Sequence, residues 1–337
     1  MTTRSRLDAR WAIVTQKYSI FLVLIGMLVV STIISPVFFS ARNFSNISRQ
    51  ISITTIIAFG QTMLIICGMI DLAAGSVMAL AGLLAVVLYK ATGSLMLSMA
   101  CGVVVGVACN MVSGLLVTRF RTPPFIATLA LQTSARGAAL LYTNGQNVYQ
   151  LRDFIVWGQS TVFGLPTPVI FMVGIFALTW YLLNHTRYGR YLYAIGGNEE
   201  AARASGIQVN RVKMMAYAIS GAFVGLSGVL YMSRVNAGLP NAGLNFEFDA
   251  MTAAIIGGTS FSGGVGSTMG TLAGAFIMGF LGNIMNLEGV GSYMQQIIKG
   301  GIIALAVAYD IMSKSKRKRR IMGDAGGAGG AGVPAKQ

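Results

Sequence analysis

The sequence predicts an all-α polytopic membrane protein with about ten transmembrane helices and both termini in the cytoplasm. Of its 337 residues, 54% are hydrophobic and only 10% are charged, whereas soluble domains average about 25% charged residues. Seven long segments carry no Asp, Glu, Lys or Arg: residues 18–41, 50–70, 72–89, 91–118, 154–186, 214–233 and 250–287. Such continuous runs predict helices, because membrane-spanning strands need only about ten residues of alternating polarity.

Hydropathy and turn residues divide the chain into spans near 18–38, 51–70, 75–89, 95–117, 123–141, 167–184, 213–232, 248–260, 268–285 and 292–312. Some of these are short or broken, and irregular backbone at membrane depth must be buried in protein or face water. We therefore expect three regions: a cytoplasmic N-terminal segment over 1–17, a transmembrane domain over 18–312 and a cytoplasmic tail over 313–337. The transmembrane domain includes a large cytoplasmic loop over about 185–212.

The distribution of basic residues predicts the orientation. With both termini inside, 18 of the 25 Lys and Arg residues fall in cytoplasmic segments and five outside, as the positive-inside rule requires. The run KSKRKRR at 314–320 follows the last span, which favours an anchor near anionic lipid over a nucleic-acid site. The Gly/Ala-rich stretch after it is expected to be disordered.

The large inner loop predicts a short helix that is capped at both ends. Asn198 is a suitable N-cap, and Glu199 and Glu200 place negative charge where the helix dipole favours it. The alanines that follow are strong helix formers, and Gly206 can adopt a left-handed C-cap. Gly196 and Gly197 are expected to break the chain before this helix. These residues alone leave two interpretations: a surface helix on the inner leaflet, or a docking helix for another protein.

A second glycine-rich stretch, GGTSFSGGVGSTMG, occupies residues 257–270 of the charge-free run 250–287. It predicts the reversal between two spans, with Ser260 and Ser262 able to satisfy backbone groups. A phosphate-binding loop is excluded because no Lys follows the glycines. The chain has no Walker A motif, so it cannot hydrolyse ATP by that route on its own.

Asp71 interrupts two apolar runs in CGMIDLAAGSVMALAG. A charged group left at mid-membrane costs about 2.5–3.5 kcal/mol, so Asp71 either caps a helix at the membrane edge or lines a polar cavity. The predicted topology places it near the inner face, which favours the cap. Gly75 and Ser76 then begin the next helix.

Most other polar residues within the predicted spans are neutral amides. They are Gln61, Asn110, Gln132, Asn283, Gln295 and Gln296, beside the charged Arg136 and Lys299. Amides hydrogen-bond hydroxylated solutes and also neighbouring helices, and packing is the favoured interpretation for each of them. The sequence shows no carboxylate pair, metal-spaced cluster or Ser/His/Asp set, so it predicts neither an enzyme nor a metal site.

Four ordered stretches carry a family resemblance: DLAAGS at 71–76, TPPFIATLA at 122–130, TRYGRYLYAIGGNEEAARASGI at 186–207 and GGTSFSGGVGS at 257–267. Together they closely resemble the bacterial sugar ABC-transporter permeases. These comprise the ribose, xylose, arabinose and galactose importers, with the autoinducer-2 importer as a relative. The resemblance covers about residues 10–315 and implies a homodimer of permeases in the bacterial inner membrane. It also implies two cytoplasmic ATP-binding subunits and a periplasmic sugar-binding protein. Because the partner subunit binds the ATP, no cofactor is expected in this chain.

In that family the loop carrying E-A-A-x-x-x-G is the coupling helix, which fits a cleft of the ATPase. The resemblance therefore favours docking over a surface helix here. It implies an ATPase-docking set of Gly197, Asn198, Glu199, Glu200, Ala201, Ala202 and Gly206.

The expected function is thus the membrane-spanning subunit of an ATP-driven importer, which translocates a pentose or hexose delivered by a binding protein. The alternative is an ion-coupled secondary sugar transporter. That alternative would need an ion-coupling carboxylate at mid-depth, for which the sequence offers only Asp71.

Two breaks in the spans, Asp71–Ser76 and Gly257–Ser267, predict the cytoplasmic gate. The candidate pathway and gate residues are Asp71, Gly75, Ser76, Ser260, Ser262, Gln132 and Asn283. GSVMALAG at 75–82 and GSTMGTLAG at 266–274 share a weak similarity, and broken helices beside a cavity can present hydrogen-bonding groups to a solute. The alternative is that both breaks are tight turns packed away from the dimer axis.

Overall fold

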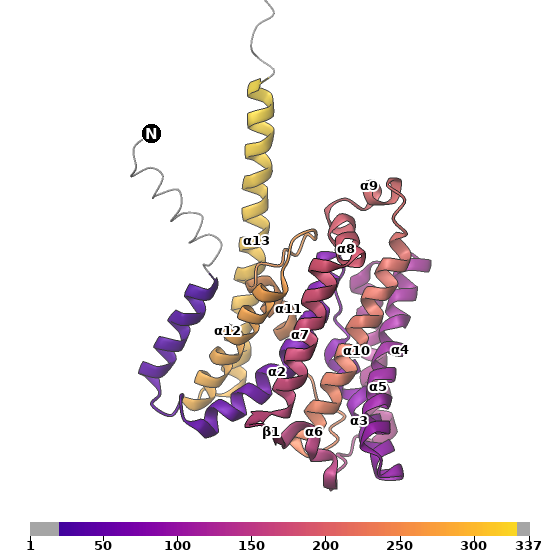
Figure 1. The fold of residues 1–337 in the computed structure, drawn as a ribbon, viewed down its shortest axis with the longest axis vertical. Coiled ribbons are helices and arrows are strands. Elements are labelled where there is room, and N and C mark those ends of the chain that lie inside the picture. Colours follow the sequence, from indigo (N-terminus) through magenta and orange to yellow (C-terminus); the bar gives the residue numbers. More distant parts are fainter. Residues whose placement is uncertain (1–19, 329–337) are drawn as a thin grey trace, which may run out of the picture.

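The computed structural model describes residues 20–328, in which nearly every element is a helix (Figure 1). A first apolar helix covers Ile20–Ile34. The long helices that follow are α2 (Ala41–Ile66), α3 (Ala74–Thr92), α4 (Leu95–Arg119), α5 (Pro124–Thr143), α7 (Thr167–His185), α10 (Val209–Val235), α12 (Thr268–Leu287) and α13 (Ser292–Ala328). Shorter elements are the 3₁₀ helix η1 (Arg152–Ile155), α6 (Val156–Gln159), α8 (Arg187–Gly197), α9 (Glu199–Ala204) and α11 (Phe246–Ile256).

Six of the described helices are long and apolar enough to cross a membrane: α2, α3, α4, α7, α10 and α12. The all-α membrane class predicted from the sequence is therefore confirmed. The predicted N-terminal segment 1–17 and the last part of the predicted tail, residues 329–337, lie outside the described residues. Helix α13 continues to Ala328, past residue 312 where the sequence ends the last predicted span.

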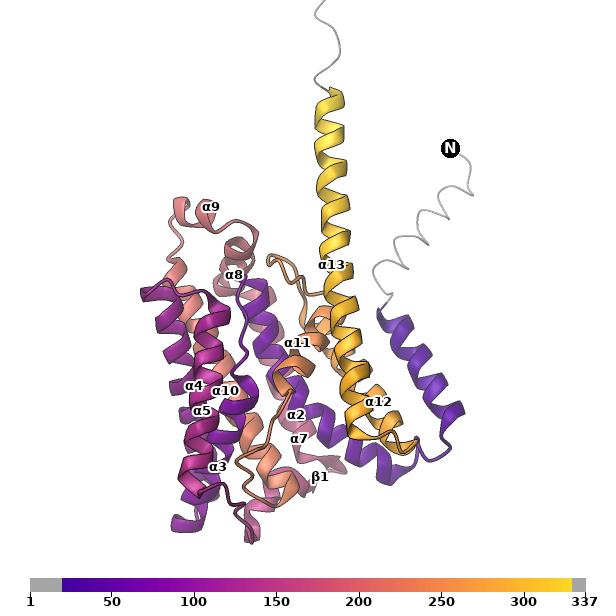
Figure 2. The same cartoon turned by 180° about the vertical axis from the view of Figure 1, so that it is seen from behind.

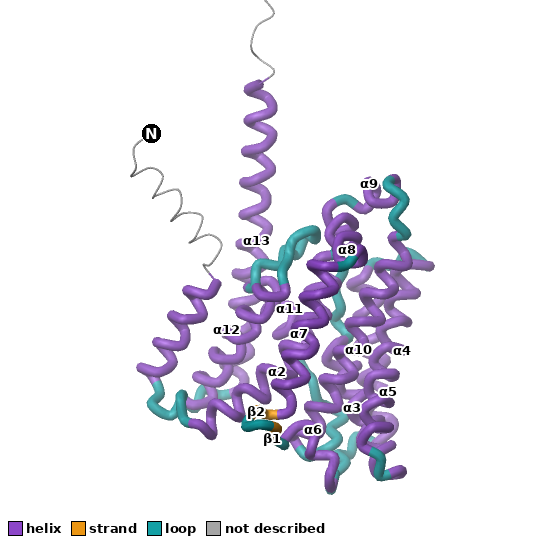
Figure 3. The backbone as a smooth tube through the Cα atoms, in the orientation of Figure 1, coloured by secondary structure: helices purple, strands orange, loops and turns teal. Residues whose placement is uncertain are grey.

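The bundle has two distinct ends (Figures 1 and 3). Helices α8 and α9 lie at one, which we call the α9 end, together with the loop between α11 and α12. At the opposite end, η1 and α6 lead into a two-stranded hairpin of β1 (Thr161–Val162) and β2 (Leu165–Pro166). Thr161 pairs with Pro166 and Val162 pairs with Leu165 in antiparallel register.

The expected chain break at Gly196 and Gly197 is wrong. Helix α8 runs through both glycines, and Asn198 alone separates it from α9. Gly196 serves close packing instead, because a Cβ on it would overlap the carbonyl oxygen of Ile66 at the end of α2. The predicted inner loop is thus two helices that rest on the bundle.

Two irregular segments lie inside the bundle, and each leads into a helix (Figure 2). Residues 67–73 lead from α2 to α3, and residues 236–245 lead from α10 to α11. The eleven residues of α11 span about 16 Å at 1.5 Å per residue, about half the hydrocarbon thickness of about 30 Å. The two helix starts meet, since a Cβ on Gly75 would overlap the carbonyl oxygen of Gly243 and the Glu247 carboxylate.

Helix α10 lies at the centre of the bundle and packs on α4 through glycine. A Cβ on Gly106 would overlap the carbonyl oxygen of Gly221, and a Cβ on Gly225 would overlap that of Gly102. Helix α3 packs on α10 in the same way, since a Cβ on Gly82 would lie 2.5 Å from the carbonyl oxygen of Gly228. Small residues bring helix backbones close, and van der Waals packing then holds helices together where lipid removes the hydrophobic driving force.

Replacement of Gly225 by Val is expected to destabilise the protein by about 1–3 kcal/mol, because the new side chain overpacks the α4 contact. Gly174→Val is the matched control, since a Cβ on this exposed glycine of α7 meets nothing within 4 Å. Thermal unfolding of both variants in detergent checks the prediction. Equal melting temperatures for the two variants would contradict the glycine-packed core.

Candidate functional site

Helix α9 lies at the tip of the α9 end, and both of its termini have the capping geometry predicted from the sequence. The Asn198 side chain accepts a hydrogen bond from the Ala201 N–H at 3.0 Å, as an N-cap does. At the other end, Gly206 adopts a φ of 83°, the left-handed conformation that glycine adopts without strain. The predicted short helix and both of its caps are therefore present, although the helix is six residues long.

Charge fixes α9 to the start of α10. Glu199 accepts hydrogen bonds from Lys213 at 2.7 Å and from Arg203 at 3.0 Å. Burial raises the pKa of the Glu199 carboxyl, but the hydrogen bonds and charges of Lys213 and Arg203 outweigh it and hold the pKa below its usual value. Glu199 therefore remains ionised at neutral pH and keeps both partners.

The predicted docking residues differ in exposure. Ala202 is 4% exposed and faces the protein itself, whereas Gly197, Glu200 and Ala201 are exposed to solvent. Because α9 has one buried face and one exposed face, only the exposed residues can contact another protein directly.

Three backbone segments meet beneath α9, in what we call the glycine junction: Ile66–Gly68, Gly196–Gly197 and Gly263–Gly266. The Gly264 N–H donates to the Ile66 carbonyl oxygen at 2.8 Å, and the Tyr193 hydroxyl of α8 donates to the Gly266 carbonyl at 2.9 Å. A Cβ on Gly263 would lie 2.8 Å from the carbonyl oxygen of Gly196. Helix α8 thus packs directly against the end of α2, just before the break at 67–73, and against the loop 257–267.

The loop between α11 and α12 is also tied to α13. The Asp310 carboxylate accepts hydrogen bonds from the Ser260 hydroxyl and the Phe261 N–H, both at 3.0 Å. Ser260 is buried, and Ser262, two residues on, is exposed. Sequence reasoning missed Asp310, although its signal was present as the only carboxylate in the last predicted span.

Asp71, for which the sequence leaves a cap at the membrane edge or a place in a polar cavity, lies inside the bundle. It is fully buried, and its carboxylate accepts from the Ala73 N–H at 2.9 Å and from the Asn110 amide at 2.8 Å. Asn110 precedes the end of α4 at Arg119 by nine residues, or about 13 Å along the helix. Asp71 therefore caps the turn into α3 within the bundle.

The backbone of this break is also satisfied by side chains. Gln61 donates to the Asp71 carbonyl, and the Tyr217 hydroxyl donates to the Ile70 carbonyl at 3.3 Å. These bonds explain why irregular backbone persists at this depth. They also place Gln61 and Asn110 in packing roles, as the sequence analysis favours.

The segment 236–245 and the start of α11 are held by α5. Gln132 donates to the carboxylate of Glu247 at 3.2 Å, and Arg136 donates to the carbonyl oxygens of Pro240 and Ala242, both at 2.7 Å. Ser76, one residue beyond Gly75, is buried beside this cluster. Of the predicted pathway residues, Gln132, Gly75 and Ser76 come together here with Asp71 nearby.

Asn283 lies elsewhere. Its amide exchanges two hydrogen bonds with Asn43 of α2, both at 3.0 Å. This pair joins α12 to the start of α2, away from the Gln132 cluster. The seven predicted pathway residues therefore form no single site in one chain.

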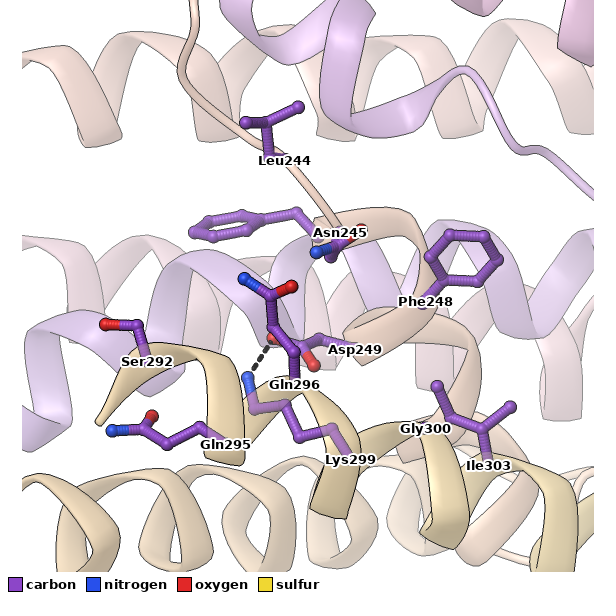
Figure 4. Close-up of a pocket in the computed structure, with 11 residues that line it drawn as sticks. Leu244, Asn245, Phe248, Asp249, Ser292, Gln295, Gln296, Lys299, Gly300 and Ile303 are labelled. Carbon is purple, nitrogen blue, oxygen red and sulfur yellow. Dashed lines mark hydrogen bonds and ion pairs between the residues drawn. The ribbon is translucent and has the colours of Figure 1, made fainter. Parts of the chain in front are cut away.

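A cavity of about 410 Å³ opens between α11 and α13 (Figure 4). Lys299 of α13 donates to the carboxylate of Asp249 in α11 at 2.7 Å, and both side chains are partly exposed. The full lining is Leu244, Asn245, Phe246, Phe248, Asp249, Ser292, Gln295, Gln296, Lys299, Gly300 and Ile303. The sequence analysis noted Gln295, Gln296 and Lys299 as intramembrane polar residues but missed Asp249, which directly precedes a charge-free run.

Two adjacent glycines of the glycine junction should differ in how far their substitution lowers stability. Gly196→Ala introduces a Cβ that overlaps the Ile66 carbonyl oxygen, whereas a Cβ on Gly197 meets nothing within 4 Å. We expect Gly196→Ala to lower stability by about 1–3 kcal/mol and Gly197→Ala to change it by less than about 0.5 kcal/mol. Thermal unfolding in detergent measures both, and a Gly197→Ala variant as unstable as Gly196→Ala would argue against the junction.

Comparison with known proteins identifies the family. Residues 43–307 match the model described as "Branched-chain amino acid transport system / permease component". The chain is 40% identical to the ribose import permease protein RbsC of Escherichia coli (strain K12), across 92% of this chain and 99% of that protein. It is 36% identical to the D-allose transport system permease protein AlsC of the same strain, across 92% and 98%.

It is also 33% identical to the L-arabinose ABC transporter permease protein AraH of Azospirillum brasilense, across 89% of this chain and 88% of that protein. The family model covers most of the transmembrane domain, and the relatives align over nearly their whole lengths. The chain therefore belongs to the sugar ABC-transporter permeases, as a multi-pass transport subunit of the bacterial inner membrane.

Proposed function

We propose that this chain carries a monosaccharide, a pentose or a hexose, across the inner membrane. The observation that carries this proposal is the near full-length similarity to permeases whose names specify ribose, D-allose and L-arabinose. An ion-coupled mechanism has no support among these relatives. Asp71, the carboxylate it would use, has both oxygens engaged by Ala73 and Asn110.

The proposed assembly contains two copies of this chain, two cytoplasmic ATP-binding subunits and a periplasmic sugar-binding protein. About ten helices cross the membrane, both termini are cytoplasmic, and the α9 end faces the cytoplasm. The capped helix α9, with Glu200 and Ala201 exposed, supports docking of the ATP-binding subunit there. ATP is bound by that partner, and this chain needs no cofactor.

The three regions expected from the sequence are part of the proposal: the segment 1–17, the permease domain over 18–312 and the tail over 313–337. The basic run at the start of the tail lies against anionic lipid at the cytoplasmic surface. Within the permease domain, α8 and α9 form the coupling unit, and the glycine junction beneath them joins it to the two breaks.

The two breaks form the cytoplasmic gate in this proposal. Movement of α9 by the ATP-binding subunit reaches the loop 257–267 through Gly196 and Tyr193, which contact Gly263 and Gly266 respectively. The same junction includes Ile66, at the end of α2, and so reaches the break at 67–73. Both breaks then change together because they share one set of backbone contacts.

Assembly can be tested in proteoliposomes. We expect ATP-driven sugar uptake only when this chain is reconstituted with its ATP-binding subunit and binding protein, and neither ATPase activity nor uptake from the chain alone. Ala201→Arg, on the exposed face of α9, should abolish co-purification of the ATP-binding subunit. The control Gln146→Arg, at an exposed position remote from α9, should preserve it. Uptake by the chain alone, driven by an ion gradient, would refute the proposal.

The gate can be tested with single cysteines in a background lacking Cys67, Cys101 and Cys109. Ser262→Cys is exposed and should react with a water-soluble maleimide at a rate that changes with nucleotide state in the assembled transporter. Ser76→Cys, at a position 2% exposed, should react more slowly than Ser262→Cys in the resting state. A Ser262→Cys rate that is identical in every nucleotide state would place the loop outside the gate.

A further inference from the structure

The cavity between α11 and α13 holds charge at membrane depth. Lys299 follows the first residue of α13 by seven positions and precedes Asp310 by eleven, or about 10 Å and 16 Å along the helix. Asp310 marks the level of the loop 257–267 through its bonds to Ser260 and Phe261. The Asp249–Lys299 pair therefore lies near the middle of the bundle's depth.

Such a pair cannot face hydrocarbon without cost. Ionised side chains within spans face the protein interior or a water-filled cavity and mark solute pathways. Here both partners remain partly exposed, with 27% of the Lys299 side chain and 16% of the Asp249 side chain accessible. We therefore expect the cavity beside them to contain water or a polar solute when the protein is in the membrane.

The pair is incompletely satisfied by the protein. One oxygen of Asp249, Oδ2, accepts from Lys299, and this bond uses one of the three N–H donors of the ammonium group. Among the described residues, no other hydrogen bond to either charged group is present. The pair thus offers a solute an acceptor and donors side by side, while its two charges neutralise each other.

Neutral amides and aromatic rings complete the lining. Figure 4 shows Gln296 and Asn245 close to the Asp249–Lys299 pair, on facing elements. Both amides are exposed, and each supplies donors and an acceptor. Gln295, by contrast, is bonded to Asn286 and Val290. Phe248 adds an aromatic ring that is 38% exposed, and apolar surface with a few polar groups is the usual composition of a ligand site.

The ion pair, the amides and the aromatic ring of this cavity favour one class of solute over others. A charged ligand would repel one member of the ion pair, and an apolar ligand would leave both members desolvated without compensation. A neutral ring bearing several hydroxyls matches the neighbouring donors and acceptors, and its C–H face can pack on Phe248.

We propose that this cavity is a binding station for the transported monosaccharide, in which Gln296, Asp249 and Lys299 contact its hydroxyls. The inference rests on the proposed function and specifies where along the pathway the sugar is held and which residues discriminate between sugars. The helix α13 supplies the amide and the ammonium, and α11 supplies the carboxylate and the aromatic ring.

The test uses the complete transporter in proteoliposomes, with D-ribose, D-allose and L-arabinose as probes. Gln296→Leu removes an amide that makes no hydrogen bond within the described chain, so folding should be unaffected. We expect its uptake of the best substrate to fall about three- to tenfold, the effect of one lost hydrogen bond. The ranking of the three sugars should also change, while co-purification of the ATP-binding subunit stays unchanged. The matched control, Tyr293→Phe, removes a hydroxyl from α13 outside the cavity and should transport normally.

A second measurement locates the sugar. Gln296→Cys, in the cysteine-free background, should react with a water-soluble maleimide, and a transported sugar presented by its binding protein should slow the reaction. A sugar that the transporter does not carry should leave the rate unchanged. Slower labelling of Gln296→Cys in the presence of a transported sugar, together with a changed ranking of the three sugars in Gln296→Leu, supports the proposed binding station.

Three results would overturn it. Unreactive Gln296→Cys in a transporter with normal uptake would show that another surface, such as the second copy, covers the cavity. Uptake by Gln296→Leu equal to that of Tyr293→Phe for all three sugars would remove the specificity role. If the wild-type assembly takes up no monosaccharide, the proposed function fails too. Normal wild-type uptake with unaffected variants overturns this inference alone.

Discussion

Close backbone-to-backbone approach at glycine is the contact on which the rest of this structure depends. Helix α10 reaches α4 and α3 only because Gly221, Gly225 and Gly228 lack a Cβ. The same constraint operates at the α9 end, where Gly196 lies against the Ile66 carbonyl. In a membrane, where burial of apolar surface no longer favours association of helices, this packing holds the bundle together.

Two interrupted spans introduce polar backbone into this packed bundle, and side chains from neighbouring helices satisfy it. Gln61, Asn110 and Tyr217 bond to the break at 67–73. Arg136 bonds to two carbonyls of the segment 236–245. These breaks place the starts of α3 and α11 inside the bundle, which creates the positions where a solute pathway can meet hydrogen-bonding groups.

The glycine junction relates the docking helix to the break at 67–73 and to the loop 257–267. Because α8 contacts the end of α2 and the loop 257–267 at once, a displacement of α9 acts on both in the proposed mechanism. The Asp310 bonds extend the connection to α13, the helix that carries Lys299. The proposed gate and the proposed sugar site are thus linked through one loop.

The sequence by itself determined the helical membrane class, the family, the caps of α9 and the irregular stretches near Asp71 and over 257–267, because these follow from local composition and spacing. A charge-free run predicts a helix from its own residues, and Asn198 and Gly206 each cap a helix turn only a few residues away. Only the tertiary structure decided that Gly196 packs against Ile66, that Asp71 is buried at depth and that Asp249 pairs with Lys299. The Gly196–Ile66, Asp71–Asn110 and Asp249–Lys299 contacts join residues at least 39 positions apart. Such pairings depend on how the helices pack, which residue spacing does not encode.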